Sequence, residues 1–482
     1  MSMSKGIARV LGLSPLILGC SVMADTALAA DTVRFATFNA SLNRDASGQL
    51  LSDLGNPLAS GVTTTVARRI QQAHNVAEII QRVNPDILLV NEFDFDQNGV
   101  PGSSSIPSAL GYSSQAAQLF QDNFLSAAHG NAVRGTTQGV VFPYRYTPVT
   151  NTGLASGLDL DNSGGVGGGN DAFGFGNFAG QYGFTVYSRY EIVGVRTFQN
   201  FLWKDMPGNL LTNDNTGNKL WAADGSGYYN DAEKNALRLS SKNHVDVTLR
   251  INGQDVHFLT AHPTPPTFDG AEDKNGKRNH DEIRFWADYV DGADYIYDDQ
   301  GAMGGLADGA SFVIAGDYNA DPFDGDSYAN AINQLLNHPR VNAAVTPESA
   351  GGTAAATYPS NNGAANQSHD GDPRFDTADF SDSAPGNLRV DYVLPSANLD
   401  IQDAGIFWPV DSNTGVANTT GELFDLVGTY NNPGLYAGLP SSDHKAVWVD
   451  VQVAAVPEPE TYALMLAGLG LVGLVSRRRR IF

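Results

Sequence analysis

Short apolar runs recur along the chain, and several of them end in acidic, amide or imidazole side chains. Runs of this length are typical of buried strands. Polar residues placed directly after such runs lie where strands end and where open sites form. The six clearest stretches are TFNA (37–40), LLVNEF (88–93), FLTAHPTPP (258–266), FVIAGDYNADP (312–322), LRVDYVLP (388–395) and SSDHKAVWVDV (441–451). The pattern predicts strands whose polar ends meet at one site.

Two other stretches have the spacing of amphipathic helices. Between residues 66 and 83, apolar side chains recur every three or four positions, which predicts a helix that Asn84-Pro85 ends. The strand predicted at 86–90 follows and carries Glu92 at its end. A second helix is predicted over 281–289, after a cluster of basic residues.

Further strands are predicted between these helices. Residues 243–250 and 255–260 alternate well enough to form a hairpin about Asn252-Gly253, a dipeptide that favours a tight turn. Residues 182–192 predict one more strand, which carries Tyr187 and Arg189.

The residues that follow the six apolar stretches form one chemical set of carboxylates, amides and imidazoles. Hard oxygen ligands beside two imidazoles can bind a divalent cation and cleave a phosphate ester. Asp317 and Asn319 alternate along an extended segment, so we expect both side chains on the same side, where they could hold a water and a phosphoryl oxygen together. The candidate site residues are Asn39, Glu92, His262, Asp317, Asn319, Asp391, Asp443 and His444.

This set, in this order, resembles the endonuclease/exonuclease/phosphatase superfamily, which includes pancreatic deoxyribonuclease, abasic-site endonucleases, inositol polyphosphate phosphatases and bacterial sphingomyelinases. The resemblance runs from about Val33 to Val453, and its most specific pieces are Gly316–Asn319 and Ser442–His444. It implies a four-layer α/β sandwich, in which two mixed β-sheets lie face to face with helices outside. The site would lie at one open end of this sandwich.

The resemblance also implies roles at the metal. Glu92, placed rigidly after a buried strand, is the first candidate ligand, and Asn39 and Asp443 would help directly or through water. We expect Mg²⁺ or Mn²⁺, because the set lacks the cysteines or clustered histidines that favour zinc.

By the same resemblance, Asp317 would orient or deprotonate the attacking water and Asn319 would bind phosphate. Asp391 would hydrogen-bond His444 and raise its pKa. A protonated His444 would stabilise the phosphorane, whereas a neutral one could act as the base, and both assignments stay open. His262 would donate to phosphate or protonate the leaving oxygen.

Three aspartate-rich segments suggest structural Ca²⁺. They begin at Asp94, Asp159 and Asp273. The first two match the opening of a calcium loop, but position twelve is Ser105 or Asn170 in place of the bidentate glutamate. Bound calcium and solvated turns are both open interpretations.

The N-terminal 30 residues have the features of a secretory signal peptide: Lys5 and Arg9, an apolar stretch, and small residues before a cut near Ala29 or Ala30. Removing it also removes Cys20, the only cysteine, so no disulfide is expected. The alternative is a lipoprotein signal with Cys20 at its cleavage site.

Residues 456–482 resemble the PEP-CTERM sorting signal of Gram-negative bacteria, which implies an exosortase-type enzyme as a processing partner. Its apolar stretch, 462–476, would contact the membrane before processing, but at ~1.5 Å per residue it spans only about 22 Å of a ~30 Å core. The alternative is a retained short membrane helix with Arg477–Arg480 inside. Both interpretations export the globular part across the inner membrane, to the cell surface or the medium.

The segment between these ends, 31–455, would be one catalytic domain. Insertions are expected near 93–180, 200–231, 341–382 and 410–439, which are rich in Gly, Ser, Asn and Asp. The two ends hold 6 of the 29 Lys/Arg and 3 of the 52 Asp/Glu, which leaves 23 basic and 49 acidic residues. This acidity opposes polyanionic substrates unless metal ions offset it.

The sequence therefore predicts an exported metal-dependent phosphoesterase. A nuclease acting on DNA or RNA and a phosphatase acting on small phosphorylated compounds stay near equals within that prediction. A different class is a non-catalytic surface or matrix-binding protein that kept the fold. Such a protein would be expected to lose site residues, whereas all eight candidates are present.

Overall fold

The computed structural model describes residues 31–57, 64–94, 114–214, 216–357, 363–410, 421–428 and 440–455, together with Leu469. The predicted signal peptide, the sorting tail and most of the segment at 410–439 lie outside these residues. Within the described part, no helix is long and apolar enough to cross a membrane.

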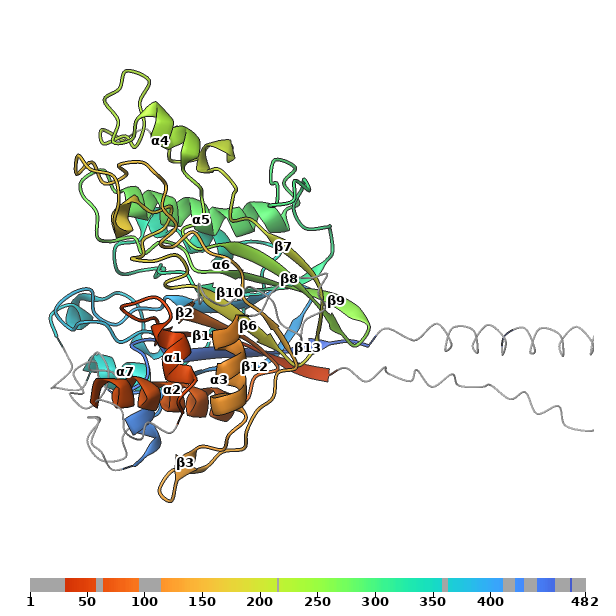
Figure 1. The fold of residues 1–482 in the computed structure, drawn as a ribbon. Coiled ribbons are helices and arrows are strands. Elements are labelled where there is room, and N and C mark those ends of the chain that lie inside the picture. Colours follow the sequence, from red (N-terminus) through yellow and green to blue (C-terminus); the bar gives the residue numbers. More distant parts are fainter. Residues whose placement is uncertain are drawn as a thin grey trace, which may run out of the picture.

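Two mixed sheets form the centre of the molecule (Figure 1). One has six strands in the order β12-β13-β1-β2-β6-β5, and the other has five in the order β11-β10-β9-β8-β7. The strands of the first sheet are β1 (Asp31–Leu42), β2 (Ile87–Phe93), β5 (Tyr144–Tyr146), β6 (Phe184–Ser188), β12 (Asp400–Phe407) and β13 (Ala446–Val453). Those of the second are β7 (Glu191–Thr197), β8 (His244–Ile251), β9 (Gln254–Ala261), β10 (Ser311–Asp317) and β11 (Asp391–Pro395).

The two sheets pack face to face through apolar side chains. Phe35 of β1 and Phe258 of β9 are fully buried, with ring centroids 5.7 Å apart. The neighbouring residue on β9, Leu259, faces the opposite way, into a second cluster that covers the outer face of the five-stranded sheet. Burial on both faces explains why these strands are near-continuous apolar runs in the sequence.

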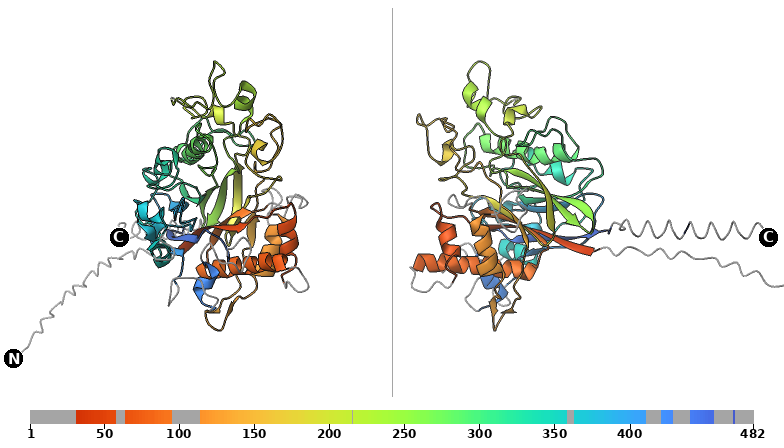
Figure 2. Two further views of the ribbon diagram at one scale, coloured as in Figure 1. Left: turned by 90° about the vertical axis from the view of Figure 1, so that its left-hand side faces the viewer. Right: turned by 45° about the vertical axis from the view of Figure 1, so that its right-hand side comes forward.

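Helices cover both outer faces, which completes the four-layer sandwich (Figures 1 and 2). The red and orange helices of the N-terminal part lie against the six-stranded sheet, and the green helix α5 lies against the other. The helices are α1 (Gln49–Leu54), α2 (Thr64–Val83), α3 (Gln115–Phe120), α4 (Asp231–Ala236), α5 (Lys274–Val290), α6 (Asn333–Leu336) and α7 (Ala350–Thr357).

The predicted helix at 66–83 is α2, and the predicted hairpin is β8–β9, with Asn252 and Gly253 both at positive φ in the turn. Helix α5 begins seven residues before the predicted 281. Its first turns are polar, so they lack an apolar repeat, and they are held by the buried ion pair of Lys277 with Asp214 at 2.7 Å.

Residues 182–192 form two strands in different sheets, where one strand was predicted. The chain leaves β6 at Ser188 and enters β7 at Glu191, and the backbone N–H of Arg189 donates to the carbonyl of Asp86. Both strands are apolar, so the pattern could not show this crossing between the sheets.

The second half of the segment at 93–180 is more ordered than its composition predicts. Helix α3, the π-helical turn Gln121–Leu125 and the edge strand β5 all belong to it. The rings of Phe120, Phe124 and Phe142 are buried in the main core. A few aromatic residues therefore anchor a segment that is otherwise polar.

The described ends of the chain lie side by side. Asp31, the first residue of β1, pairs with Val453, the last residue of β13, in antiparallel register. Asn39 and His444 lie at the other ends of the same two strands. The candidate site and the Asp31–Val453 pair are thus at opposite ends of the sandwich.

Candidate active site

The strand order brings the candidate residues together from both sheets. The parallel strands β1 and β2 carry Asn39 and Glu92 at their carboxyl ends. In the other sheet, β9 is parallel to β10, and β10 is antiparallel to β11 with Asp317 directly opposite Asp391. Because the sheets face each other, these ends form one polar cluster at the edge of the core.

Asp317 lies at the centre of this cluster. Its Oδ2 accepts a hydrogen bond of 2.9 Å from the side-chain amide of Asn39. The same oxygen is 3.3 Å from Nε2 of His262 and 3.7 Å from Nε2 of His444. Its Oδ1 accepts from the backbone N–H of Asn319 at 3.0 Å. The buried carboxylate of Asp317 therefore faces four donor groups, three of them side chains and one a backbone N–H.

His444 is paired with Asp391, as the sequence predicted. Its Nδ1 donates to Asp391 Oδ2 at 2.8 Å, and the hydroxyl of Thr377 donates to the same oxygen at 2.8 Å. Burial favours the neutral imidazole, but the charges of Asp391 and Asp317 outweigh it and raise the pKa of His444 well above its usual value. Burial raises the pKa of Asp391 to about 6, against the opposing charge of His444. The pair therefore holds its proton on His444 at neutral pH.

His262 has the opposite charge state. It is buried, and burial, together with the positive charges of Lys242 and His444, lowers its pKa well below the usual value. Its Nε2 faces Asp317, which only an N–H can satisfy, so we assign the proton of the neutral ring to Nε2. Its Nδ1 is buried and has no hydrogen-bond partner among the described residues.

Glu92 occupies a strained and buried position. Its φ is 54°, a left-handed conformation that a non-glycine residue adopts at a cost. Burial raises the pKa of Glu92 to about 7, and the charges of Asp443 and Asp317 add to this, whereas a hydrogen bond from Asn39 opposes it. The charge of His444 also opposes the rise, but it does not cancel it. Carboxylate oxygens held in such surroundings are ligands that suit a divalent metal ion.

Asp443 is held by hydroxyl groups. Its Oδ1 accepts from the hydroxyl of Ser41 at 3.3 Å and lies 3.4 Å from the hydroxyl oxygen of Ser442. Ser442 also donates to the carbonyl of Asn39 at 2.7 Å and accepts from the backbone N–H of His444 at 3.1 Å. Ser442 thus ties β1 to the start of β13 and fixes two candidate residues at once.

Asn319 does not lie as its spacing from Asp317 predicted. Strand β10 ends at Asp317, and Asn319 has φ 52°, so the chain turns and the simple alternation of side chains stops. The side-chain amide of Asn319 donates to the carbonyl of Pro263 at 3.2 Å. Asn319 therefore contacts the loop that follows His262. Strand periodicity does not predict this contact.

Sequence reasoning missed two residues that contribute to the cluster. Lys242 is buried just before β8, 3.4 Å from the carbonyl of Pro263. Burial lowers the pKa of Lys242, while the charges of Glu282, Asp317 and Glu92 oppose that shift. Its position directly before the predicted strand 243–250 could have marked Lys242 as a candidate site residue. Thr377 lies in a polar loop, and nothing in the sequence distinguished it.

The aspartate-rich segments give a mixed result for calcium. Asp94 is buried and accepts from the backbone N–H groups of Arg44 at 2.7 Å and Tyr182 at 3.0 Å, so its oxygens face inward. The rest of that segment lies outside the described residues. Asp159, Asp161 and Asp171 bring ligand oxygens within 4.8 Å of one another, and all three carboxylates accept hydrogen bonds within their own loop. Calcium stays a prediction there.

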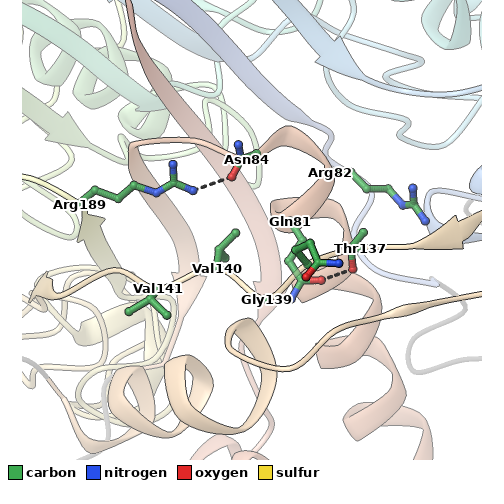
Figure 3. A pocket seen from close by; sticks show the side chains of 9 residues that line it. Gln81, Arg82, Asn84, Thr137, Gly139, Val140, Val141 and Arg189 are labelled. Atoms are coloured by element: carbon green, nitrogen blue, oxygen red, sulfur yellow. Dashed lines mark hydrogen bonds between the residues drawn. The ribbon is translucent and has the colours of Figure 1, made fainter. Parts of the chain in front are cut away.

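A pocket of about 640 Å³ lies at the other end of β2 from Glu92 (Figure 3). Arg189 donates to Asn84 at 2.6 Å on one side of it, and Thr137 bonds Gln81 on the other. Arg189 is also paired with Asp86 at 3.0 Å. The pocket contains none of the candidate site residues.

Comparison with solved structures finds relatives of low identity. The endonuclease/exonuclease/phosphatase from Beutenbergia cavernae is 16% identical, with 88% of this chain and 72% of that chain covered and a TM-score of 0.42. Sphingomyelinase C from Streptomyces griseocarneus is 15% identical, with 87% and 99% covered and a TM-score of 0.38. Beta toxin from Staphylococcus aureus is 13% identical, with 86% and 99% covered and a TM-score of 0.39. No curated protein matches the chain.

Two family models match the sequence. The PEP-CTERM protein-sorting motif matches residues 455–480, which indicates export and placement at the surface or outside a Gram-negative cell. The model of the Endonuclease/Exonuclease/phosphatase family matches residues 36–444, a span that contains all eight candidate residues. The chain therefore belongs to the endonuclease/exonuclease/phosphatase family.

Proposed function

We propose that the protein is an exported, divalent-metal-dependent phosphoesterase that hydrolyses phosphodiester or phosphomonoester bonds by in-line attack of water. Members of its family are generally metal-dependent hydrolases of phosphate esters. The observation that carries the proposal is the cluster around Asp317 Oδ2, which joins an amide, a neutral imidazole and a protonated imidazole beside the acidic pair Glu92 and Asp443.

Glu92 would hold Mg²⁺ or Mn²⁺, with Asn39 and Asp443 completing the protein ligands. The charge balance supports this, because Asp443 and Asp317 raise the pKa of Glu92 and the charge of His444 offsets this only in part. When bound, the ion would supply positive charge that stabilises the developing negative charge on the phosphoryl oxygens. Asn39, which also donates to Asp317, would couple the metal ligands to the catalytic carboxylate.

Asp317 would orient the attacking water and accept its proton. His444 is protonated at neutral pH, which favours the assignment in which it stabilises the phosphorane over the one in which it acts as a base. The neutral His262, with its N–H toward Asp317, would donate to a phosphoryl oxygen or assist the leaving group. Asn319 and the buried cation of Lys242 would attract the phosphate from the loop side.

The acidity of the protein favours a small phosphate ester as substrate. The segment between the predicted signal peptide and the tail has 49 acidic against 23 basic residues, and a long polyanion would be repelled by that field. An extracellular nuclease is the alternative, because metal ions bound at the site add positive charge where the phosphate arrives.

The experiment that tests the proposal measures hydrolysis of bis-p-nitrophenyl phosphate and of plasmid DNA side by side. The purified protein should be active with Mg²⁺ or Mn²⁺ and inactive after EDTA treatment. Faster hydrolysis of the small ester would support the phosphatase-type assignment, and faster nicking of DNA would support the nuclease. Inactivity toward both in either metal would favour a non-catalytic surface protein.

We also propose that the tail is processed by an exosortase-type enzyme after residues 462–476 have contacted the inner membrane. The match to the sorting motif supports this step. Because the tail follows β13 at the end of the sandwich opposite the candidate site, the site would face away from that membrane during export.

A further inference from the structure

The loop that follows His262 has few backbone groups with which to anchor itself. It reads Pro263-Thr264-Pro265-Pro266, and proline has no backbone N–H, so Thr264 carries the only backbone donor of these four residues. Strand pairing does not reach the loop, because the ladder between β8 and β9 ends at the His244–Ala261 pair. The placement of His262 therefore depends on what holds Thr264.

Two side chains of α5 hold both backbone groups of Thr264. Oε2 of Glu282 accepts from its N–H at 2.7 Å, and the side-chain amide of Asn279 donates to its carbonyl at 2.8 Å. Asn279 and Glu282 are three residues apart on the helix, so they lie on the same face, and both are fully buried. Because prolines flank Thr264 and restrict the backbone, fixing this residue also fixes Pro263 and His262.

Glu282 also reaches the segment before β8. Its other oxygen, Oε1, accepts from the backbone N–H of Ser241 at 2.6 Å, one residue before the buried Lys242. Glu282 therefore joins the segments that carry Lys242 and His262, with one oxygen for each. A carboxylate is needed here, because two N–H donors require two acceptor oxygens and a glutamine offers only one.

Asn279 also reaches the end of β10. Its side-chain amide donates to the carbonyl of Tyr318 at 2.8 Å, in addition to that of Thr264. Tyr318 lies between Asp317 and Asn319, where the chain turns after the strand. An amide nitrogen with two hydrogens can serve both carbonyls at once, which an aspartate in its place could not do.

We propose that Asn279 and Glu282 are positioning residues of the active site, which set His262 and Lys242 relative to Asp317. Both act through backbone groups of the five-stranded sheet and its loops. Glu92, the first metal ligand proposed above, belongs to the six-stranded sheet, so the metal site should not depend on α5. The effect on catalysis rests on the proposed function, whereas the placing of His262 does not.

Glu282→Gln tests the proposal with almost no change in volume. The variant keeps one acceptor oxygen and turns an NH₂ group toward the other backbone N–H, so one of the two segments is released. With bis-p-nitrophenyl phosphate as substrate, kcat should fall roughly ten- to a hundredfold, the scale expected when reacting groups are misplaced by about 1 Å. The Mg²⁺ concentration that gives half-maximal activity should stay that of wild type.

Asp281→Asn, one residue earlier on α5, is the matched control. Asp281 is also fully buried, and its Oδ2 accepts from the indole N–H of Trp203 and the backbone N–H of Leu210, both at 2.6 Å. These partners belong to the segment 200–213, which carries none of the candidate site residues. Asp281→Asn should therefore lower Tm but keep the kcat of wild type. Equal losses of kcat in the two variants would overturn the proposal, because general destabilisation would explain both.

Two measurements need no activity. In Glu282→Gln, peptides that contain Ser241 or Thr264 should exchange their amide hydrogens faster, whereas in Asp281→Asn this should occur at Leu210. In protein labelled with ¹⁵N-histidine, the ring signals of His262 should shift in Glu282→Gln and not in Asp281→Asn.

Asn279→Asp should give the same pattern as Glu282→Gln, because a carboxylate cannot donate to the two carbonyls. A wild type that is inactive toward phosphate esters would contradict the proposed function alone, and the ring signals of His262 would still decide whether α5 places it. Unchanged His262 signals in Glu282→Gln, or a loss of activity that extra Mg²⁺ restores, would overturn the proposal.

Discussion

The two histidines on either side of Asp317 are equally deep in the protein and have opposite charge states. His444, on the β13 side, has Asp391 behind it, and its pKa lies well above the usual value. His262, after β9, has Lys242 near it, and its pKa lies well below. Burial lowers the pKa of both rings, so the difference comes from the neighbouring charges. One histidine is therefore a cation on one side of Asp317, and the other is a neutral N–H donor on the opposite side.

The largest effects are expected at Asp317, which both histidines face, and at the cationic histidine itself. Asp317→Ala and His444→Ala should each lower kcat by at least about a hundredfold, the usual scale for losing an acid–base or electrostatic group. Steady-state kinetics with saturating Mg²⁺ measures this.

The control for these variants needs a histidine that lies outside the core and outside the candidate site. His244, outside every motif, is unsuitable because it is buried and bonds Ser240 and the carbonyl of Glu282. His369 is only partly buried and lies outside the candidate cluster, and its ring forms a hydrogen bond with the carbonyl of Pro385. If His369→Ala lost as much activity as the other two, impaired folding would explain all three.

The next prediction concerns His444 and its partner Asp391 alone. Asp391→Asn removes the charge that keeps His444 protonated, so the pKa of His444 should fall. In wild type the raised pKa keeps His444 protonated up to high pH. In the variant this pKa is lower, so activity should begin to fall at a lower pH on the alkaline side. We expect a loss of about ten- to a hundredfold at neutral pH, partly regained in acid. An unchanged alkaline limb in the pH profile of kcat would separate His444 from the chemistry.

Glu92→Gln should weaken Mg²⁺ affinity and leave both histidines in place. Its loss of activity should be recovered, at least in part, by raising the Mg²⁺ concentration, because Asn39 and Asp443 still offer oxygens. Circular dichroism should show an unchanged fold. Full activity of the variant in limiting Mg²⁺ would remove Glu92 from the metal site.

A smaller effect is expected at His262, the histidine that follows β9. Lys242→Met removes a positive charge near His262, so the pKa of His262 should rise. The acidic limb of the pH profile should therefore move to higher pH, since the neutral ring becomes protonated earlier. The shift is limited because burial, the largest cause, stays. A movement of the alkaline limb instead would show that Lys242 acts on His444.

The comparison also shows what a sequence can predict. Residues that end buried strands, such as Glu92, His262 and Asp317, could be placed because strand ends on neighbouring strands meet at one edge. The bond of His444 to Asp391 and the rise in its pKa were also predicted, but the sequence left the charge state of His444 open. The lowered pKa of His262 could not be predicted from the sequence. Lys242 is 20 residues away and comes near His262 only because β8 and β9 pair as a hairpin.

Irregular segments were the hardest to predict. Asn319 departs from strand alternation because it adopts a left-handed conformation, which a local pattern does not reveal. Thr377 contacts Asp391 from a polar loop 14 residues away. The break between β6 and β7 was hidden because both strands are apolar. In each case a contact distant in sequence decides the local structure.

The smallest effect is expected from the tail, because the strand that precedes it in the chain runs away from both histidines. Strand β13 runs from Ala446, beside His444, to Val453, which pairs with Asp31 at the other end of the sheet. At about 3.3 Å per residue, these eight residues place the end of β13 roughly 25 Å from the site. A chain ending at Val456 should therefore have the same Tm, the same kcat and the same two pH limbs as a longer chain kept in detergent. The protein isolated from cells should lack Arg477–Arg480, and mass spectrometry that finds an intact Phe482 would show instead that the tail is retained as an anchor.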